Sequence, residues 1–235
     1  MTDPKKFGLE VLFEDNHLIV INKRSSDISQ GDKTGDETLP DKIKAYWKEK
    51  YDKPGNVFCG VVHRLDRPTS GVIIFTRTSK ALERLFKQFQ ARTIEKSYWA
   101  LIEEKPSKKK DTLIHFLIRK EKQNKSYAND IELANSKRAV LHYEHVSSSD
   151  NYHLLKVKLE TGRHHQIRCQ LSKMGYHIKG DVKYGARRAN PDLSICLHAR
   201  NIKFEHPVTK EEVNVTAPVP NDSLWQFFEK KEKVN

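Results

Sequence analysis

The 235-residue sequence has few cysteines and no long hydrophobic run. Its three cysteines, Cys59, Cys169 and Cys196, have no paired spacing and favour reduced thiols in apolar surroundings over disulfide bonds or a metal site. No apolar run approaches the roughly 18 residues that a membrane-spanning helix needs. The N-terminal MTDPKKFGLE also lacks an apolar segment of the signal-peptide type. We therefore expect a cytoplasmic protein without membrane contact.

Several sequence motifs that indicate catalysis or cofactor binding are also missing. There is no glycine-rich nucleotide fingerprint, and GDKTG at residues 31–35 lacks the frame of a phosphate-binding loop. His164 and His165 are adjacent, so on a helix they would point to different faces, and the remaining histidines are scattered. A glycosidase needs two carboxylates around one bond, whereas Asp66 has no acidic neighbour in its own segment. We expect no metal ion and no bound nucleotide cofactor.

Positive charge, by contrast, is in excess. A net charge of +12 and a pI near 9.5 predict a polyanionic partner, with nucleic acid as the first candidate and a membrane surface as the second. A basic protein without such a partner is the alternative. Lysine-rich loops are predicted at residues 105–110 (KPSKKK) and 119–126 (RKEKQNKS), where phosphate contact and simple solvation are both open.

Strand-like and helix-like segments are mixed along the chain, without a repeat or a clear linker. Strands are predicted at residues 9–23 around a turn at Glu14-Asp15-Asn16, and at residues 71–78, 96–104, 151–162 and 195–217. This order predicts an α+β fold, built as one domain on a largely antiparallel mixed sheet with flanking helices and loops. The domain is expected to cover residues 9–235, after an N-terminal tail at residues 1–8.

Four helices are predicted along the chain. The first covers residues 39–50, and the last lies within residues 220–230. Ser79 is the predicted cap of the second, whose apolar face is formed by Leu82, Leu85, Phe86 and Phe89. The third helix has a face formed by Ile167, Leu171 and Met174.

One carboxylate lies in the most apolar neighbourhood of this basic chain. Residues 60–80, GVVHRLDRPTSGVIIFTRTSK, place Asp66 between two arginines with apolar runs on both sides. Burial alone disfavours a charged carboxylate, so an ionised acid in such surroundings needs a guanidinium nearby. The alternative is a strand-end carboxylate that pairs with Arg64 or Arg67 and has no chemistry. The predicted turn residues that aim Asp66 are Thr69, Ser70 and Gly71.

Several segments, in this order, resemble the RluA-type family of RNA pseudouridine synthases. They are HRLDRPTSG (63–71), KSY (96–98), TGRHHQIR (161–168), GDVKYG (180–185) and LHARNIKFEHPVTKEE (197–212). The resemblance covers nearly the whole chain, from EDNHLIVINK to APVP. The sequence departs from the family where the common K-P-x-G is Lys23-Arg24-Ser25-Ser26, which affects the shape of that turn, and where the usual Pro-Ile is His177-Ile178.

The resemblance implies an assignment for individual residues. Asp66 falls on the catalytic aspartate, Tyr98 on the tyrosine that lies against the target base, and Arg168 on the arginine that pairs with the aspartate. Arg163 and His165 are as well suited to holding their loop as to touching RNA. The substrate contacts that the resemblance implies are His63, Arg64, Arg163 and Leu197, the last as an apolar wall of the uracil pocket.

The resemblance also implies the reaction, in which a uridine in RNA becomes its C-glycoside isomer. The bond from C1′ to N1 breaks, the uracil turns, and C5 bonds to C1′. Asp66 either attacks C1′ or assists proton removal there, and both routes remain open. The nucleotide must leave its stack at a cost of a few kcal/mol. Arg64 falls on a position implicated in displacing the base, and stacking on Tyr98 would return ~1–3 kcal/mol. No cofactor or metal ion is required.

We therefore expect a monomeric RNA pseudouridine synthase with one catalytic domain, which acts on structured ribosomal or transfer RNA. Nothing before Leu9 is long enough for an accessory RNA-binding domain. A catalytically idle RNA-binding or RNA-chaperone module of the same fold is the alternative, and the intact Asp66, Tyr98 and Arg168 argue against it. A DNA-binding protein is a third interpretation, but no helix-turn-helix or zinc-finger signature supports it.

Overall fold

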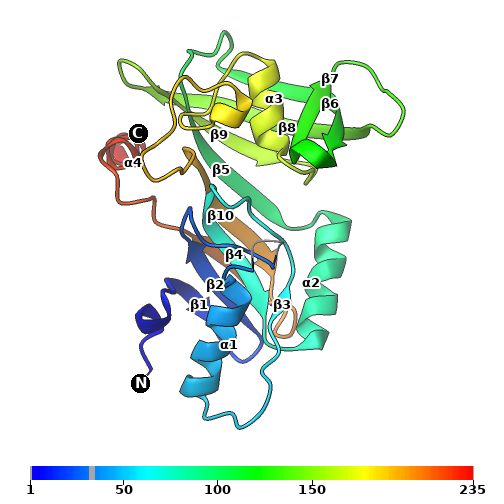
Figure 1. Ribbon diagram of the computed structural model, residues 1–235, viewed down its shortest axis with the longest axis vertical. Coiled ribbons are helices and arrows are strands. Elements are labelled where there is room, and N and C mark those ends of the chain that lie inside the picture. The colour runs from blue at the N-terminus through cyan, green and yellow to red at the C-terminus, as the bar shows by residue number, and fades with distance from the viewer. Residues whose placement is uncertain (1, 32–34, 235) are drawn as a thin grey trace. The chain divides into compact units, whose positions relative to one another are not determined.

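A computed structural model describes residues 2–31 and 35–234, and the chain divides into two compact units (Figure 1). Unit 1 comprises Met1–Glu95 and Ala199–Pro218, and unit 2 comprises Lys96–His198 and Val219–Asn235. The described residues form four α-helices and eleven β-strands, and the strand pairs of known register within each unit run antiparallel. The predicted α+β class with a largely antiparallel sheet is confirmed. One catalytic domain over residues 9–235 stays a prediction.

Unit 1 is built around two completely buried strands, β2 and β4. Its strands are β1 (Val11–Glu14), β2 (Leu18–Lys23), β3 (Gly60–Val61), β4 (Ser70–Thr76), β11 (Glu212–Thr216) and β10 (Leu197–Glu205), whose first two residues belong to unit 2. The order is β1-β2-β4-β10, with β3 on β4 and β11 on β10. The apolar stretch LIVIN before Lys23 explains why β2 takes a central position. The predicted turn between β1 and β2 is present.

The helices of unit 1 agree with prediction in extent but not in every detail. Helix α1 (Leu39–Lys50) has the predicted bounds and begins with a capping box in which Thr38 and Asp41 bond each other's backbone. Helix α2 (Ser79–Ala91) lies beside β3 and β4. Its cap is Thr78 rather than Ser79, because the Thr78 hydroxyl accepts from the N–H of Ala81.

The predicted apolar face of α2 is wrong at one position. Phe86 is 46% exposed, whereas Ala81 and Leu85 are the buried residues of the helix. The buried face of the helix is therefore narrower than the apolar face that its sequence predicts. In the predicted N-terminal tail, residues Pro4–Phe7 form a 3₁₀ helix, η1, and the Phe7 ring meets Tyr46 of α1 edge-on at 5.8 Å.

Unit 2 combines an antiparallel sheet with two helices. Its strands are β5 (Glu95–Ile102), β6 (Lys110–Lys120), β7 (Lys125–Asn129), β8 (Lys137–Ser148) and β9 (His153–Leu159), in the order β5-β9-β8-β6-β7. Helix α3 (Gln166–Lys173) packs on β6 and β7, and α4 (Ser223–Val234) packs on β8 (Figure 1). Met174 was predicted on the buried face of α3, but it lies just past the helix and is 39% exposed.

The segment at residues 25–37, which includes GDKTG, contains in its described part no helix or strand beyond one bridge between Ile28 and Thr38. Residues 32–34 lie outside the described residues. The basic segment 119–126 connects β6 to β7 through a short 3₁₀ helix, η2 (Glu121–Gln123). None of the three cysteines, all within the described residues, is part of a disulfide bond. In residues 2–31 and 35–234 no helix is long and apolar enough to cross a membrane.

Candidate active site

Asp66 lies half-buried in the loop between β3 and β4 of unit 1. Its carbonyl oxygen accepts a hydrogen bond of 3.0 Å from the N–H of Thr69, which closes the turn that contains Pro68. Gly71, the second residue of β4, has φ 114°, and a Cβ there would lie 2.3 Å from the carbonyl oxygen of Ala199. Only glycine tolerates both this backbone angle and this approach. The predicted turn after Asp66 is therefore held in one shape.

A buried lysine that the sequence interpretation missed fixes the same loop. Lys23, the last residue of β2, is 1% exposed. Its ammonium donates to the carbonyl oxygens of Arg24 at 2.8 Å, Arg67 at 3.0 Å and Thr69 at 2.8 Å. These bonds use all three N–H donors of an ammonium group. Lys23 thus ties β2 to the residues that follow Asp66.

The charge of Lys23 is subject to opposing influences. Burial lowers the pKa of Lys23 to about 7, while the negative charges of Asp27 and Asp66 act in the opposite direction. The three carbonyl acceptors also favour the ammonium form, because a neutral amine has only two N–H donors. The loop that carries Asp66 is therefore held by a buried lysine of its own unit whose pKa lies close to neutral pH.

The residues before Asp66 are fixed as well. The Ser29 hydroxyl donates to the carbonyl oxygen of Leu65 at 2.9 Å and accepts from its N–H at 3.3 Å. The Nε2 atom of His63 accepts from the N–H of Ile74 at 3.0 Å. These bonds give His63 a role in holding the loop, and its predicted contact with substrate stays a prediction. Arg64, between the two anchored residues, is exposed.

In unit 2, Arg168 is 5% exposed on helix α3 and forms an ion pair with Asp181. Nε of Arg168 donates to Oδ2 of Asp181 at 2.6 Å, and Nη2 donates to Oδ1 at 2.8 Å. This two-pronged geometry is the strongest that arginine and a carboxylate form. The guanidinium also lies 4.9 Å from the ring centre of Tyr184. Within unit 2 the counter-charge of Arg168 is Asp181, and its pairing with Asp66 stays a prediction.

His165 holds the turn before α3 rather than facing solvent. Its backbone has a left-handed φ of 52°, and its Nδ1 lies 2.9 Å from the Tyr184 hydroxyl. Burial, followed by the positive charge of Arg168, lowers the pKa of His165 to about 2, so the ring is neutral at neutral pH. Arg163 is exposed, and its Nε donates to the carbonyl oxygen of Arg138 at 3.2 Å. Contact between Arg163 and substrate stays a prediction.

The two predicted base-contacting residues of unit 2 are both buried. Tyr98 lies on β5 opposite Val157 of β9, and Leu197 is the first residue of β10. Burial of these two side chains agrees with a role as the walls of an apolar binding site. It agrees equally with an ordinary place in the core. Their contact with the uracil ring therefore stays a prediction.

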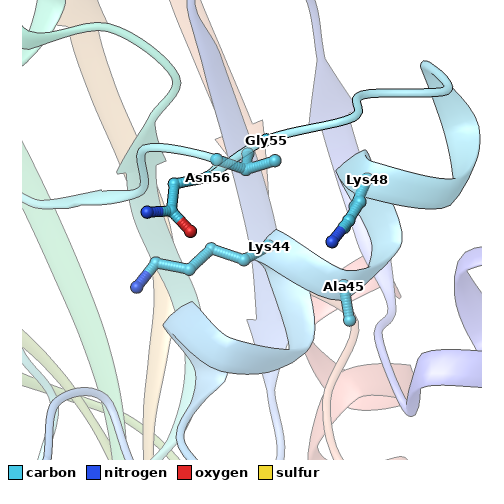
Figure 2. Close-up of a pocket in the computed structure, with 6 residues that line it drawn as sticks. Lys44, Ala45, Lys48, Gly55 and Asn56 are labelled. Atoms are coloured by element: carbon cyan, nitrogen blue, oxygen red, sulfur yellow. The ribbon is translucent and has the colours of Figure 1, made fainter.

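Unit 1 also has an open hollow of about 470 Å³ that contains none of the predicted site residues (Figure 2). Figure 2 shows Lys44 and Lys48 on α1 and Asn56 on the segment that crosses it. Two ammonium groups and an amide suit an anion such as a phosphate. The described residues contain no group of three or more metal-binding side chains.

Comparison with known proteins assigns the chain to a family. The family model described as RNA pseudouridylate synthase matches residues 17–173. Human RNA Pseudouridylate Synthase Domain Containing 4 has a similar fold, with a TM-score of 0.79 at 22% identity, over 97% of this chain and 95% of that chain. Human RNA Pseudouridylate Synthase Domain Containing 1 gives a TM-score of 0.70 at 21% identity, over 94% of each chain.

Curated relatives of similar sequence point to the same family. Ribosomal large subunit pseudouridine synthase D of Zymomonas mobilis is 30% identical, over 96% of this chain and 74% of the relative. An uncharacterized RNA pseudouridine synthase of Bacillus subtilis is 31% identical, over 91% of this chain and 70% of the relative. Together with the HRLDRPTSG segment and its anchored loop, these matches show that the chain belongs to the RluA-type family of RNA pseudouridine synthases, isomerases that act on uridine in RNA.

Proposed function

We propose that this protein converts specific uridines of large-subunit ribosomal RNA to pseudouridine, with Asp66 as the reacting carboxylate. The observation that carries the proposal is the family motif around Asp66 on a loop that Lys23 and Ser29 anchor from both sides. The choice of ribosomal RNA rests on relatives from Zymomonas mobilis and Vibrio cholerae that are named ribosomal large subunit pseudouridine synthase D. Transfer RNA is the alternative substrate class.

In the proposed reaction no atom is gained or lost. The C1′–N1 bond of the uridine breaks, the uracil turns, and a new bond joins C5 to C1′. The proton lost from C5 is balanced by the proton gained at N1. In one route Asp66 attacks C1′ as the C1′–N1 bond breaks, and it leaves again when C5 bonds to C1′. In the other route it assists removal of a proton at C1′, and that proton returns to the ribose. In both routes Asp66 starts as an ionised group.

The target base has to leave its stack before Asp66 can reach C1′, at a cost of a few kcal/mol. We assign the displacement to Arg64, whose exposed side chain extends between two anchored residues. Tyr98 then stacks on the flipped uracil and Leu197 supplies an apolar wall, while Arg168 serves as the counter-charge of Asp66. His63 and Arg163 complete the proposed substrate contacts.

The basic loops are the proposed phosphate contacts. Between β6 and β7, Nζ of Lys120 and Nζ of Lys125 lie 5.1 and 5.5 Å from the ring centre of the exposed Tyr127. Cations around an exposed aromatic ring are typical of surfaces that bind unpaired nucleic acid. We propose that the protein acts as a monomer in the cytoplasm, without a cofactor or metal ion.

Pseudouridine mapping across total RNA, with and without the gene, tests the proposal. We expect a lost signal in large-subunit ribosomal RNA, restored by the wild-type gene but not by Asp66→Asn. The matched control is Asp36→Asn, which removes an exposed carboxylate paired with Arg67 of the same loop. A signal lost only from transfer RNA would change the substrate class. Unchanged signals in every RNA, with retained RNA binding, would favour the catalytically idle module.

A further inference from the structure

One large apolar side chain of unit 2 is held out into solvent. Leu193 is 77% exposed, the highest value among the large hydrophobic residues that the structure describes. Its backbone is left-handed, with φ 58°. A leucine is unfavourable in this conformation because its Cβ crowds the backbone. Neither burial nor backbone preference accounts for a leucine at this position, and strained residues of this kind cluster at functional sites.

The turn that presents Leu193 is firmly built. The N–H of Leu193 donates to the carbonyl oxygen of Asn190 at 2.9 Å, across Pro191 and Asp192. Asp192 Oδ1 accepts from the N–H of Ser194 at 3.1 Å and from its hydroxyl at 2.6 Å. The buried Asn190 amide donates to the Ser194 carbonyl oxygen at 3.0 Å. Leu193 is therefore a fixed projection and not part of a loose loop.

This turn packs directly on a segment that carries predicted site residues. A Cβ at Gly180 would lie 2.6 Å from both the Asn190 amide nitrogen and the Ser194 carbonyl oxygen, so only glycine fits there. Gly180 precedes Asp181, the partner of Arg168. After the turn, the N–H of Cys196 donates to the carbonyl oxygen of Lys179 at 2.8 Å, and Leu197 follows. The position of Leu193 is thus coupled to the predicted base-binding residues of its unit.

Exposed cations precede the projection in the sequence. Lys183, Arg187 and Arg188 are exposed on the segment that leads into the turn. Arg187 approaches Glu103 to 3.8 Å, but its side chain stays 80% exposed. An apolar tip that follows a basic segment does not suit an apolar protein surface, whereas it suits a polyanion that contains stackable apolar bases. Nucleic-acid-binding proteins use single leucines in this way, as wedges between base steps.

We propose that Leu193 is such a wedge: it inserts between stacked bases of the RNA beside the target uridine and lowers the cost of flipping that uridine. The inference rests on the proposed function, because it needs RNA as the substrate. Leu193 is a positioning residue in this scheme, since it acts on the stack and not on the reacting atoms. Arg187 and Arg188 hold the flanking phosphates.

The test compares Leu193→Gly with Leu193→Met in the full chain. Glycine suits the left-handed backbone, so the melting temperature of Leu193→Gly should equal or exceed that of the wild type. Methionine keeps an apolar side chain of similar length. The probe is an RNA hairpin around the mapped uridine, with the uridine paired in the stem and 2-aminopurine next to it. A second RNA has the same uridine in an unpaired strand.

We expect Leu193→Gly to lower the single-turnover rate on the paired substrate about tenfold and to leave the unpaired substrate within about twofold, because only the former requires unstacking. Leu193→Met should stay near the wild type on both. The rise of 2-aminopurine fluorescence on binding should be lost in Leu193→Gly. A normal rise in that variant, or an equal loss of rate on both substrates, overturns the wedge.

The same measurements separate failure of the wedge from failure of the proposed function. The fluorescence measurement repeated in an Asp66→Asn background does not depend on turnover, so it tests the wedge even if the assigned reaction is wrong. If instead Leu193→Gly changes only self-association, measured by sedimentation, the projection is a contact between copies of the chain and the proposal fails. Failure of the proposed function would leave the wild type inactive on both RNAs.

Discussion

The two units hold their predicted catalytic residues in different ways. Unit 1 fixes the Asp66 loop through its backbone, because Lys23 bonds main-chain carbonyl oxygens around it. Unit 2 fixes Arg168 through the side chain itself, by a buried two-pronged pair with Asp181. A side chain held by its backbone can be replaced without loss of the anchors, whereas a buried ion pair cannot lose one member cheaply. Activity and stability should therefore separate when Asp66 is replaced and stay linked when Arg168 is replaced.

The largest expected effect is that of Arg168→Met. It leaves the Asp181 carboxylate buried without a counter-charge, so we expect a loss of about 3–5 kcal/mol in the free energy of unfolding together with loss of activity. Asp66→Asn should abolish activity, with RNA affinity within about a factor of ten and stability within about 1 kcal/mol. Urea unfolding measures the stability of each variant, and single-turnover kinetics measure its activity. Equal stability losses for the two variants would contradict the difference between the units.

A test of whether Arg168 acts on Asp66 needs a variant that still folds. Arg168→Met combined with Asp181→Asn removes both buried charges and should recover part of the stability lost in the single variant. If Arg168 keeps Asp66 ionised, activity of the double variant should be poor near neutral pH and rise toward about pH 9. Arg168→Lys should do better than methionine but stay impaired, because an ammonium lacks the two-pronged contact. A loss equal at every pH would assign Arg168 to positioning instead.

The second prediction concerns Lys23→Met, which removes the anchor and keeps the apolar stem. Carbonyl oxygens of Arg24, Arg67 and Thr69 would lose their donor, at about 1–3 kcal/mol for each that stays buried and unpaired. Turnover should fall about tenfold or more, because a small misplacement of a catalytic group has that effect. Lys80→Met on the exposed face of α2 is the matched control. Normal turnover in Lys23→Met would show that the loop keeps its shape without the cation.

Sequence patterns predicted the local features of both units and missed the long-range ones. Helix α1 was predicted from end to end, and the residues at its start, Thr38, Pro40 and Asp41, are all local signals. The cap of α2 was assigned one residue late because Thr78 and Ser79 are both competent caps. The exposure of Phe86 depends on what packs against the helix, which periodicity does not specify.

In the predicted site, too, the local features were predicted from the sequence and the long-range contacts were missed. The motif around Asp66 was visible in the sequence, but the partners of its loop were not. Lys23 lies 44 residues before Arg67, and nothing near Lys23 in the sequence indicates burial except the apolar stretch that it ends. The pair of Arg168 and Asp181 joins two segments that were each recognised, but a chain with 43 basic and 31 acidic residues offers too many opposite charges to choose between.

A smaller effect is expected from His165, whose pKa burial lowers to about 2. Below its unfolded value of about 6.5 the unfolded chain binds a proton that the native ring does not, so stability falls as pH decreases. One such group contributes about 1.4 kcal/mol per pH unit. His165→Asn, which tolerates the left-handed backbone, should therefore flatten the decline of unfolding free energy between about pH 6.5 and 5. An unchanged slope in urea titrations would mean that the native ring takes up the proton.

The smallest effect is expected from the KPSKKK loop of unit 2, because two of its lysines already have acidic neighbours. Lys108 pairs with Asp111 and Lys110 with Glu144, each at 3.0 Å and each largely exposed. Contact with an RNA phosphate would have to compete with these pairs. Replacement of residues 108–110 with glutamine should lower the salt slope of RNA binding by ~0.7 for each lost contact to a single strand. We expect one such step, from Lys109, rather than three.

Lys120→Gln with Lys125→Gln, at the exposed Tyr127, is the comparison in the same unit and should lower the slope by about two such steps. Lys87→Gln on α2, paired with Glu83, is the control in unit 1 and should leave the slope unchanged. Binding of one labelled RNA over a series of salt concentrations measures all three. A full three-step loss in the KPSKKK variant would show that RNA displaces the acidic partners, and an unchanged slope would make this loop a solvated one.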